Sequence, residues 1–288
     1  MVAKPHKVSP VTLLTRGAPV AVFDSGKATH EPWRDSAAAR AADRVYLHDG
    51  VVEESKRISY QDLVQRGKMI YPGTRIGRPG RAVTYWITIF FMRLLNFRWS
   101  VTVTGSENVM RGPAILVGNH VDAMDPVAIV MKQWWRVTAF AKVEVFENRG
   151  AIFFRWMGQI PLRRGDENST RWALDMASQV LAEGTMLGLY PEGTRSPDKK
   201  SLHKIHRRIL IPIFESHPQV PVHTITTTYG KKKFGRQQVF VHLSKRLPID
   251  VSAMSAAHIV DVIKNEILKA GGMAYVDAFA RDIKARKG

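Results

Sequence analysis

Short apolar runs alternate with longer amphipathic ones from about residue 100 to residue 245. The short runs are rich in β-branched and aromatic residues and are bounded by Gly, Pro, Asp or Asn, which is typical of strands. We predict strands at 100–104, 114–118, 137–142, 159–163, 186–190, 220–226 and 239–244. Strands that alternate with helices indicate an α/β layer structure.

The longer runs have the spacing of amphipathic helices. We predict helices at 60–67, 126–135, 169–183 and 256–270. Ser59 is the expected N-cap of the first, and Asp125 the N-cap of the second, with Pro126 at its first helical position. The third repeats apolar residues every three or four positions, namely Trp172, Ala173, Met176, Ala177, Val180 and Leu181. The expected fold class is therefore α/β, with a mixed central sheet flanked by helices.

The most apolar segment is the run AVTYWITIFFMRLL over 82–95. It is shorter than the roughly 20 residues that a spanning helix needs, so we expect it not to cross a bilayer. Two interpretations fit it: a buried helix that packs on the core, or a helix that lies in the membrane interface. The interfacial interpretation is supported by aromatic and cationic side chains in and around the run: Tyr85, Trp86, Phe90, Phe91, Phe97, Trp99, Arg81, Arg93 and Arg98.

Composition and hydrophobic pattern divide the chain into four parts. Residues 1–80 are irregular and rich in Pro, which predicts a partly flexible amino-terminal arm. Residues 81–99 hold the interfacial or packing helix, and 100–250 form the α/β domain. Residues 251–288 are expected to contain carboxyl-terminal helices and a basic tail. The amino terminus has a charged start but no apolar stretch behind it, so no secretory signal is predicted.

Charge and cysteine content restrict the classes of partner and chemistry. The 288 residues include 43 Lys and Arg against 25 Asp and Glu, which gives a formal net charge of +18. Such a surface attracts polyanions: nucleic acid, anionic lipid or phosphorylated metabolites. The absence of cysteine excludes disulfides, a thiolate nucleophile and a Cys-based zinc site, and it fits a reducing, cytoplasmic setting.

A polar cluster follows the predicted strand at 114–118. In NHVDAMD, over 119–125, Asp125 lies five positions after His120, a spacing at which the carboxylate can hold one ring nitrogen. The other nitrogen can then take a proton from a substrate hydroxyl. The same spacing joins His30 to Asp35, but no strand precedes that pair, and we interpret it as accidental. His120 stands at the carboxyl end of a predicted strand, where α/β proteins place their sites.

Three further blocks follow along the chain. GQIPLRRG, over 158–165, ends a predicted strand with Arg163 and Arg164, whose side chains should lie on opposite faces. YPEGTRS, over 190–196, predicts a turn in which Gly193 brings backbone N–H groups near an anion and Arg195 offers a bidentate fork. The last block, VPV over 220–222, is expected to pack in the core.

In this order and at these separations, the four blocks resemble those of the glycerolipid acyltransferase family, which includes the 1-acylglycerol-3-phosphate acyltransferases. The resemblance spans roughly residues 100 to 230. It implies a domain on the cytoplasmic face of an anionic membrane surface, peripheral or monotopic, that transfers an acyl group from acyl-CoA or acyl carrier protein to a lysophospholipid hydroxyl. His120 would be the general base and Asp125 its orienting carboxylate, with no metal and no cofactor beyond the thioester. The acceptor phosphate would be held by Arg164, Glu192, Gly193, Thr194 and Arg195, and Lys142 matches a lysine common after the corresponding strand.

At three positions the chain departs from this family pattern. Asp122 replaces a common Ser and places negative charge beside His120, which should favour the inactive imidazolium unless the side chain turns away. Arg163 stands where an acidic residue is frequent, so either arginine of the pair could reach phosphate. Ile205 replaces a Gly expected in a flexible turn, which affects the choice of acceptor or donor more than the reaction type.

Several alternatives remain at this point. Glycerol 3-phosphate, another lysophospholipid or a lyso-aminolipid would suit the same chemistry. A nucleic-acid-binding protein is suggested by the charge and by the basic runs at 199–208 and 231–236, although no recognition motif accompanies them. A metal site built from His120, Asp122 and Asp125 lacks an established ligand spacing. GKAT at 26–29 lacks the first Gly and the hydroxyl of a phosphate loop.

Overall fold

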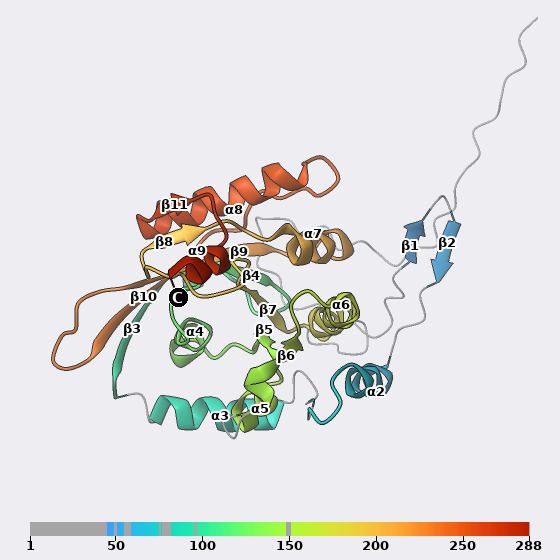
Figure 1. Cartoon of the computed structure of the whole chain (residues 1–288), viewed down its shortest axis with the longest axis horizontal. Coiled ribbons are helices and arrows are strands. Elements are labelled where there is room, and N and C mark those ends of the chain that lie inside the picture. Colours follow the sequence, from blue (N-terminus) through green and yellow to red (C-terminus); the bar gives the residue numbers. More distant parts are fainter. Residues whose placement is uncertain are drawn as a thin grey trace, which may run out of the picture.

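The seven predicted strands form one mixed sheet in the computed structural model, which describes residues 45–48, 51–54, 59–74, 76, 82–94, 97–147 and 151–287. Their order across the sheet is β3-β10-β9-β4-β7-β5-β6 (Figure 1). The bounds are β3 Trp99–Thr104, β4 Ile115–Gly118, β5 Val137–Lys142, β6 Ile160–Leu162, β7 Met186–Leu189, β9 Val222–Tyr229 and β10 Gln237–Leu243. The α/β fold class predicted from the sequence is thereby confirmed.

Strand direction decides where the motif blocks meet. β4 pairs in parallel with β7 on one side and with β9 on the other, and β7 continues in parallel to β5 and β6. Only the pairing of β9 with β10 is antiparallel within this sheet. Val117 lies opposite Leu189, so the blocks that follow β4 and β7 emerge side by side at one edge of the sheet.

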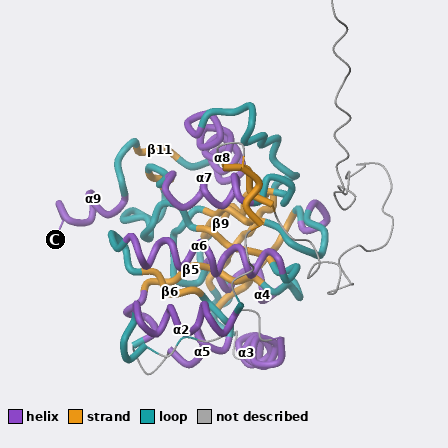
Figure 2. The backbone as a smooth tube through the Cα atoms, turned by 90° about the vertical axis from the view of Figure 1, so that its right-hand side faces the viewer, coloured by secondary structure: helices purple, strands orange, loops and turns teal. Residues whose placement is uncertain are grey.

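Helices cover both faces of the sheet (Figures 1 and 2). Their bounds are α2 Tyr60–Ile70, α3 Ala82–Leu94, α4 Asp125–Lys132, α5 Ala151–Trp156, α6 Glu167–Ala182, α7 Arg207–Ser216, α8 Ala256–Gly271 and α9 Ala280–Lys287. One hydrophobic core packs α2, α6, α7 and α8 against the sheet, and a second packs α3 and α4. In β4, Ile115 and Val117 enter the first core and Leu116 the second, as alternation along a strand requires.

The predicted N-caps agree with the structure at one helix and differ from it at another. Ser59 caps α2 as predicted, with its hydroxyl accepting from the Asp62 N–H at 3.1 Å. Asp166 caps α6, which therefore begins two residues earlier than its apolar periodicity suggests. The prediction that Asp125 caps α4 is wrong, because Met124 is the N-cap and α4 ends at Lys132. The Asp125 carboxylate has another role, described below.

Two α-helices and four short strands in the described part of the chain were not predicted from the sequence. α7 begins at the end of the basic run at 199–208 and contains Pro212, which masked its helical pattern. The short α5 follows residues outside the described part of the chain. β8, Ser201–His203, pairs in parallel with β11, Ala274–Val276, across a separation that no local pattern reveals. A hairpin of β1, Val45–His48, and β2, Val51–Glu54, lies within the predicted arm. The pair His30 and Asp35, the segment 26–29 and Arg81 fall outside the described residues.

α3 packs on the core with one face and exposes apolar side chains on the other. Tyr85, Thr88 and Ile89 on one face are buried in the second core. The other face exposes large apolar side chains: Val83, Ile87, Phe90, Phe91 and Leu94. Within the described residues, no helix combines the length and apolar character needed to cross a membrane.

The Tyr85 hydroxyl fixes α3 to the sheet, and its removal tests that attachment. It donates to the Trp135 carbonyl at 3.0 Å and accepts from the Val137 N–H at 3.0 Å. Tyr85→Phe leaves two buried backbone groups unsatisfied, so the free energy of unfolding should fall by about 1–3 kcal/mol in urea denaturation. Val83→Ala on the exposed face is the control and should change it by less than about 0.5 kcal/mol. Equal effects of the two variants would contradict the attachment.

Candidate active site

The turn between β4 and α4 is fixed to the neighbouring strand by Asn119. Its side-chain amide donates to the Thr227 carbonyl at 2.9 Å, and its oxygen accepts from the Thr227 N–H at 2.8 Å. Both groups are buried. The amide therefore continues the β4–β9 pairing beyond the end of β4, and it sets the direction in which the next residue leaves the sheet. Sequence reasoning assigned Asn119 no role.

His120 and Asp125 meet as the sequence predicted. The Nδ1 atom of His120 lies 3.0 Å from Oδ2 of Asp125. The His120 side chain is 20% exposed, whereas that of Asp125 is 0% exposed, so only the imidazole reaches the surface. An Nδ1–H that donates to the carboxylate leaves Nε2 of a neutral ring as a proton acceptor.

Both carboxylate oxygens of Asp125 are fully engaged. Besides the imidazole, Oδ2 accepts from the backbone N–H groups of Val121 at 2.6 Å and Asp122 at 2.8 Å. Oδ1 accepts from the Tyr229 hydroxyl at 2.6 Å. Burial, followed by the negative charge of Asp125, raises the pKa of Tyr229, so this phenol remains a donor. Tyr229 lies beyond the predicted end of its strand, which is why the sequence gave no signal for it.

The third block holds the backbone of His120 from both sides. Oε1 of Glu192 accepts from the His120 N–H at 2.8 Å, and the Ser196 N–H donates to the His120 carbonyl at 2.6 Å. Oε2 of Glu192 accepts from the His203 N–H at 2.9 Å. Glu192 is 1% exposed, so its side chain joins the first block to β8 inside the protein. The structure thus places this predicted phosphate ligand against backbone amides.

The Tyr190 ring lies beside the imidazole. The centroids of the His120 and Tyr190 rings are 4.8 Å apart. A Cβ atom at Gly118 would lie 3.0 Å from Tyr190 Cε1 and 3.1 Å from the Ile225 carbonyl oxygen. Gly118 therefore allows an aromatic ring to support the imidazole from the neighbouring strand.

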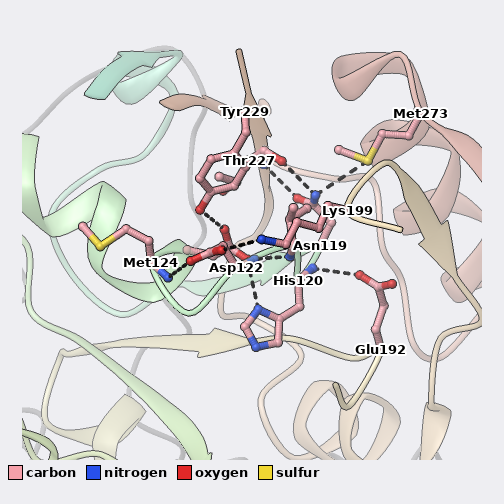
Figure 3. A network of polar contacts seen from close by, with 11 residues as sticks. Asn119, His120, Asp122, Met124, Glu192, Lys199, Thr227, Tyr229 and Met273 are labelled. Atoms are coloured by element: carbon pink, nitrogen blue, oxygen red, sulfur yellow. Dashed lines mark hydrogen bonds and ion pairs between the residues drawn. The ribbon is translucent and has the colours of Figure 1, made fainter. Parts of the chain in front are cut away.

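Asp122 turns away from the imidazole. Its Oδ1 accepts from the Met124 N–H at 3.2 Å, and its Oδ2 lies 3.3 Å from the Lys199 ammonium (Figure 3). Lys199 holds a left-handed backbone conformation, with φ of 58°, that few residues with a Cβ atom adopt. The charge that this departure from the family pattern adds is therefore balanced by a lysine from the loop after the third block.

The two adjacent arginines of the second block diverge. Arg163 lies 3.5 Å from Asp166 and donates to the Ile70 carbonyl at 3.4 Å, which directs it toward α2. Arg164 instead interacts electrostatically with Glu144 and Arg281. Burial lowers the pKa of Arg164, Glu144 opposes this lowering, and Arg281 adds to it. Arg164 also acts electrostatically on His206, which lies beside Gly193 of the third block.

The other residues predicted to bind the substrate come from the end of β5 and from the third block. Lys142 ends β5 and pairs with Glu144 at 2.9 Å. Gly193 has a φ of 69°, and a Cβ atom there would lie 3.1 Å from His206 Cδ2, so the turn requires glycine. Thr194 is half-buried in the same turn, and Arg195 is exposed. Ile205, expected in a flexible turn, is buried in the first core.

A cavity of about 520 Å³ opens beside the histidine–aspartate pair. Val121, Asp122 and Tyr229 line it on the side of the pair. Its other walls come from the start of β3, the Lys199 loop and the β9–β10 hairpin, through Arg98, Trp99, Lys199, Lys232, Gly235 and Gln237. In the described part of the chain, no three His, Asp or Glu side chains form a cluster suited to a metal ion.

A histidine held by a buried carboxylate at the carboxyl end of a parallel strand, with arginines nearby, is an arrangement suited to general-base chemistry in an α/β protein. Residues 100–228 match the family model described as Acyltransferase. The resemblance to the glycerolipid acyltransferase family, drawn from the four blocks, is confirmed by this match.

Two named proteins are similar to the chain. A 1-acyl-sn-glycerol-3-phosphate acyltransferase of Borreliella burgdorferi is 27% identical over 179 residues, which cover 59% of this chain and 70% of that protein. The crystal structure of the 1-acyl-sn-glycerophosphate (LPA) acyltransferase PlsC from Thermotoga maritima is 22% identical, with a TM-score of 0.47. That match covers 72% of this chain and 89% of the other.

Glu192→Gln tests the buried carboxylate through the pH dependence of stability. Burial raises the pKa of Glu192 from 4.5 to about 7, although the His120 and His203 N–H groups oppose the shift. Between these two pH values the folded protein keeps a proton that the unfolded chain has released. The stability of the wild type relative to the variant should therefore fall as the pH rises from about 4.5 to 7, by about 3 kcal/mol, and then stay constant.

Urea denaturation of both proteins between pH 5 and 8 measures this difference. Other titrating groups act on both proteins alike, so the difference isolates Glu192. A wild-type advantage that rises with pH over this interval would contradict the buried position of the carboxylate.

Proposed function

We propose that this acyltransferase moves a fatty acyl group from acyl-CoA or acyl carrier protein to the free hydroxyl of 1-acylglycerol 3-phosphate, which gives phosphatidic acid. The observation that carries the proposal is the His120–Asp125 pair, whose imidazole alone reaches the surface. The name of the Borreliella burgdorferi relative supports this acceptor. With His120 as general base, the acceptor hydroxyl itself is activated and attacks the thioester directly.

The first step is removal of the hydroxyl proton. Neutral His120 takes this proton on Nε2 while Nδ1–H stays bonded to Asp125. The imidazolium that forms is stabilised by the buried carboxylate. Four hydrogen bonds hold that carboxylate in place, so the ring keeps its orientation during the transfer.

The second step is acyl transfer. The hydroxyl oxygen attacks the thioester carbonyl and forms a tetrahedral oxyanion, the C–S bond then breaks, and the thiolate leaves. The imidazolium returns the proton to the thiolate, which restores neutral His120. No acyl-enzyme, metal ion or additional cofactor takes part in these steps.

The acceptor phosphate would bind to the arginines near the third block. Arg164 and Arg195 supply bidentate forks, while Gly193 and Thr194 form the turn between them and the buried Glu192. Glu192 serves the phosphate indirectly, since its carboxylate fixes the turn through two backbone amides. Lys142 lies at the edge of this site through its ion pair with Glu144.

The acceptor is identified by offering several candidates to the purified protein. Labelled acyl-CoA is incubated with 1-acylglycerol 3-phosphate, glycerol 3-phosphate, another lysophospholipid and a lyso-aminolipid. The guanidinium groups of Arg164 and Arg195 favour acceptors that end in a phosphate monoester. Preferential labelling of a lyso-aminolipid would contradict the proposed acceptor. High-affinity duplex binding without acyl transfer would favour the nucleic-acid alternative.

His120→Ala should abolish acyl transfer without unfolding the protein. General-base assistance is worth roughly 10² to 10⁴ in rate, so kcat should fall at least by that factor. Circular dichroism checks the fold, and His258→Ala, an exposed position on α8, is the matched control. Acyl transfer at a near-normal rate in the His120 variant would exclude His120 as the base.

The exposed apolar face of α3, together with α5, would attach the protein to an anionic membrane surface. The Thr84 hydroxyl on α3 donates to the Trp156 carbonyl on α5 at 3.0 Å, so the two helices lie together. Their exposed side chains include Ile87, Phe90, Phe91, Leu94, Ile152, Phe153, Phe154 and Trp156. Arg93 does not extend from this face, because it donates to the Val130 carbonyl and stacks on Trp134.

Phe90→Ser combined with Phe153→Ser tests this attachment. Co-sedimentation with phosphatidylglycerol vesicles should fall several-fold, because two half-exposed aromatic side chains no longer enter the interface. Met110→Ser is the control, since this exposed residue lies before β4, at the end of the strand away from His120. Binding should also weaken with salt. Unchanged binding of the double variant at high salt would contradict an apolar anchor here.

A further inference from the structure

The carboxyl-terminal helix α9 is docked beside the third block. β11 pairs with β8 immediately before it, and the Lys204 N–H donates to the Ala278 carbonyl at 3.2 Å. Ala280, the first residue of α9, is completely buried. The rest of the helix then projects from the body of the protein (Figure 2). The segment that the sequence described as a basic tail is therefore a helix with a fixed starting point.

Two stacked side chains connect the start of α9 to the turn of the third block. The Phe279 ring lies on the His206 ring at 4.1 Å between centroids, with an angle of 5° between the planes. The other neighbour of His206 is Gly193, whose missing Cβ atom would lie 3.1 Å from its ring. Phe279 therefore packs against the third block through one intervening imidazole.

Four cations converge where α9 leaves the body. Arg281 acts electrostatically on Arg164, and both Arg195 and Arg164 act on Lys284. Burial, and after it these two arginines, lowers the pKa of Lys284. Burial, and then Arg281 and Arg164, also lowers the pKa of His206 in their midst. The helix thus adds two positive charges to the pair of arginines that the motif blocks supply.

The acidic neighbours balance this charge only in part. Glu144 is already paired with Lys142 at 2.9 Å, and Asp282 lies 3.7 Å from Arg281. Like charges held together repel one another, so the cluster is stabilised when an anion binds among them. A phosphate monoester carries up to two negative charges and several acceptor oxygens, which suits guanidinium forks and an ammonium group.

We propose that Arg281 and Lys284 of α9 bind the phosphate of the acceptor together with Arg164 and Arg195. This inference rests on the proposed function for the identity of the acceptor. Arg281 and Lys284 are three residues apart and so share one face of the helix. Arg286 is on the opposite face by helical geometry, where it cannot reach the same ligand.

The test compares R281Q/K284Q with R286Q, which removes the same kind of charge from the other face of the helix. Steady-state kinetics use 1-acylglycerol 3-phosphate in neutral detergent micelles and acyl-CoA as the donor. The KM of the acceptor should rise at least about 10-fold in the double variant, since each lost charge-assisted hydrogen bond is worth a factor of this order. The kcat, the KM of acyl-CoA and all constants of R286Q should stay within about threefold.

Three kinetic outcomes would overturn the inference: an unchanged acceptor KM, an equal effect of R286Q, or a rise confined to the KM of acyl-CoA. The last result would assign the cluster to the phosphates of the donor. Neutral micelles carry no anionic headgroups, so an effect that appears only on anionic vesicles would assign the cluster to the lipid surface and also overturn it.

Titration with inorganic phosphate separates this inference from the proposed function. Wild-type protein should bind phosphate in calorimetry, and R281Q/K284Q should bind it at least about 10-fold more weakly while R286Q binds it normally. If no acceptor is acylated but this pattern appears, the proposed function fails and the phosphate site stands. If acylation proceeds and both variants bind phosphate as the wild type does, the site fails and the function stands.

Discussion

The burial of the Asp125 carboxylate is the constraint on which the rest of the site depends. A charged group with no exposed surface is tolerated only where each oxygen has hydrogen-bond donors. The donors come from the turn itself, from the imidazole of His120 and from Tyr229 on β9. The turn can supply its amides only if Asn119 holds it against β9. The orientation of the His120 imidazole is thus a consequence of satisfying one buried carboxylate.

The second buried carboxylate, Glu192, extends this arrangement to the phosphate side. Because β4 and β7 are parallel neighbours, the segments that follow them must share space at one edge of the sheet. Glu192 uses that proximity to join His120 to His203, and β8 passes the connection to β11 and then to α9. His120 and the proposed phosphate site are therefore positioned by one continuous series of hydrogen bonds, in which the Glu192 side chain is the central link.

Much of this was predictable from the sequence, because periodicity and spacing are local properties. The seven strands, the N-cap at Ser59 and the pair of His120 with Asp125 were predictable because each depends on residues that are close together in the chain. Tyr229, Lys199 and the pairing of β8 with β11 were not, since each depends on contacts between distant segments. The prediction of Asp125 as an N-cap was wrong for a related reason, because its side chain turns back toward the imidazole instead of satisfying its own helix.

The high positive charge is likewise divided by the fold into groups with different roles. Arg163 and Arg164 are adjacent in sequence, yet one contacts α2 and the other faces the cation cluster. Arg93 closes the end of α4, and Lys199 balances Asp122. A net charge of +18 thus predicts an anionic partner but not the residues that contact it. The fold brings Arg164 and Arg195 into electrostatic interaction with the charges of α9, and these are the residues proposed to bind the acceptor phosphate.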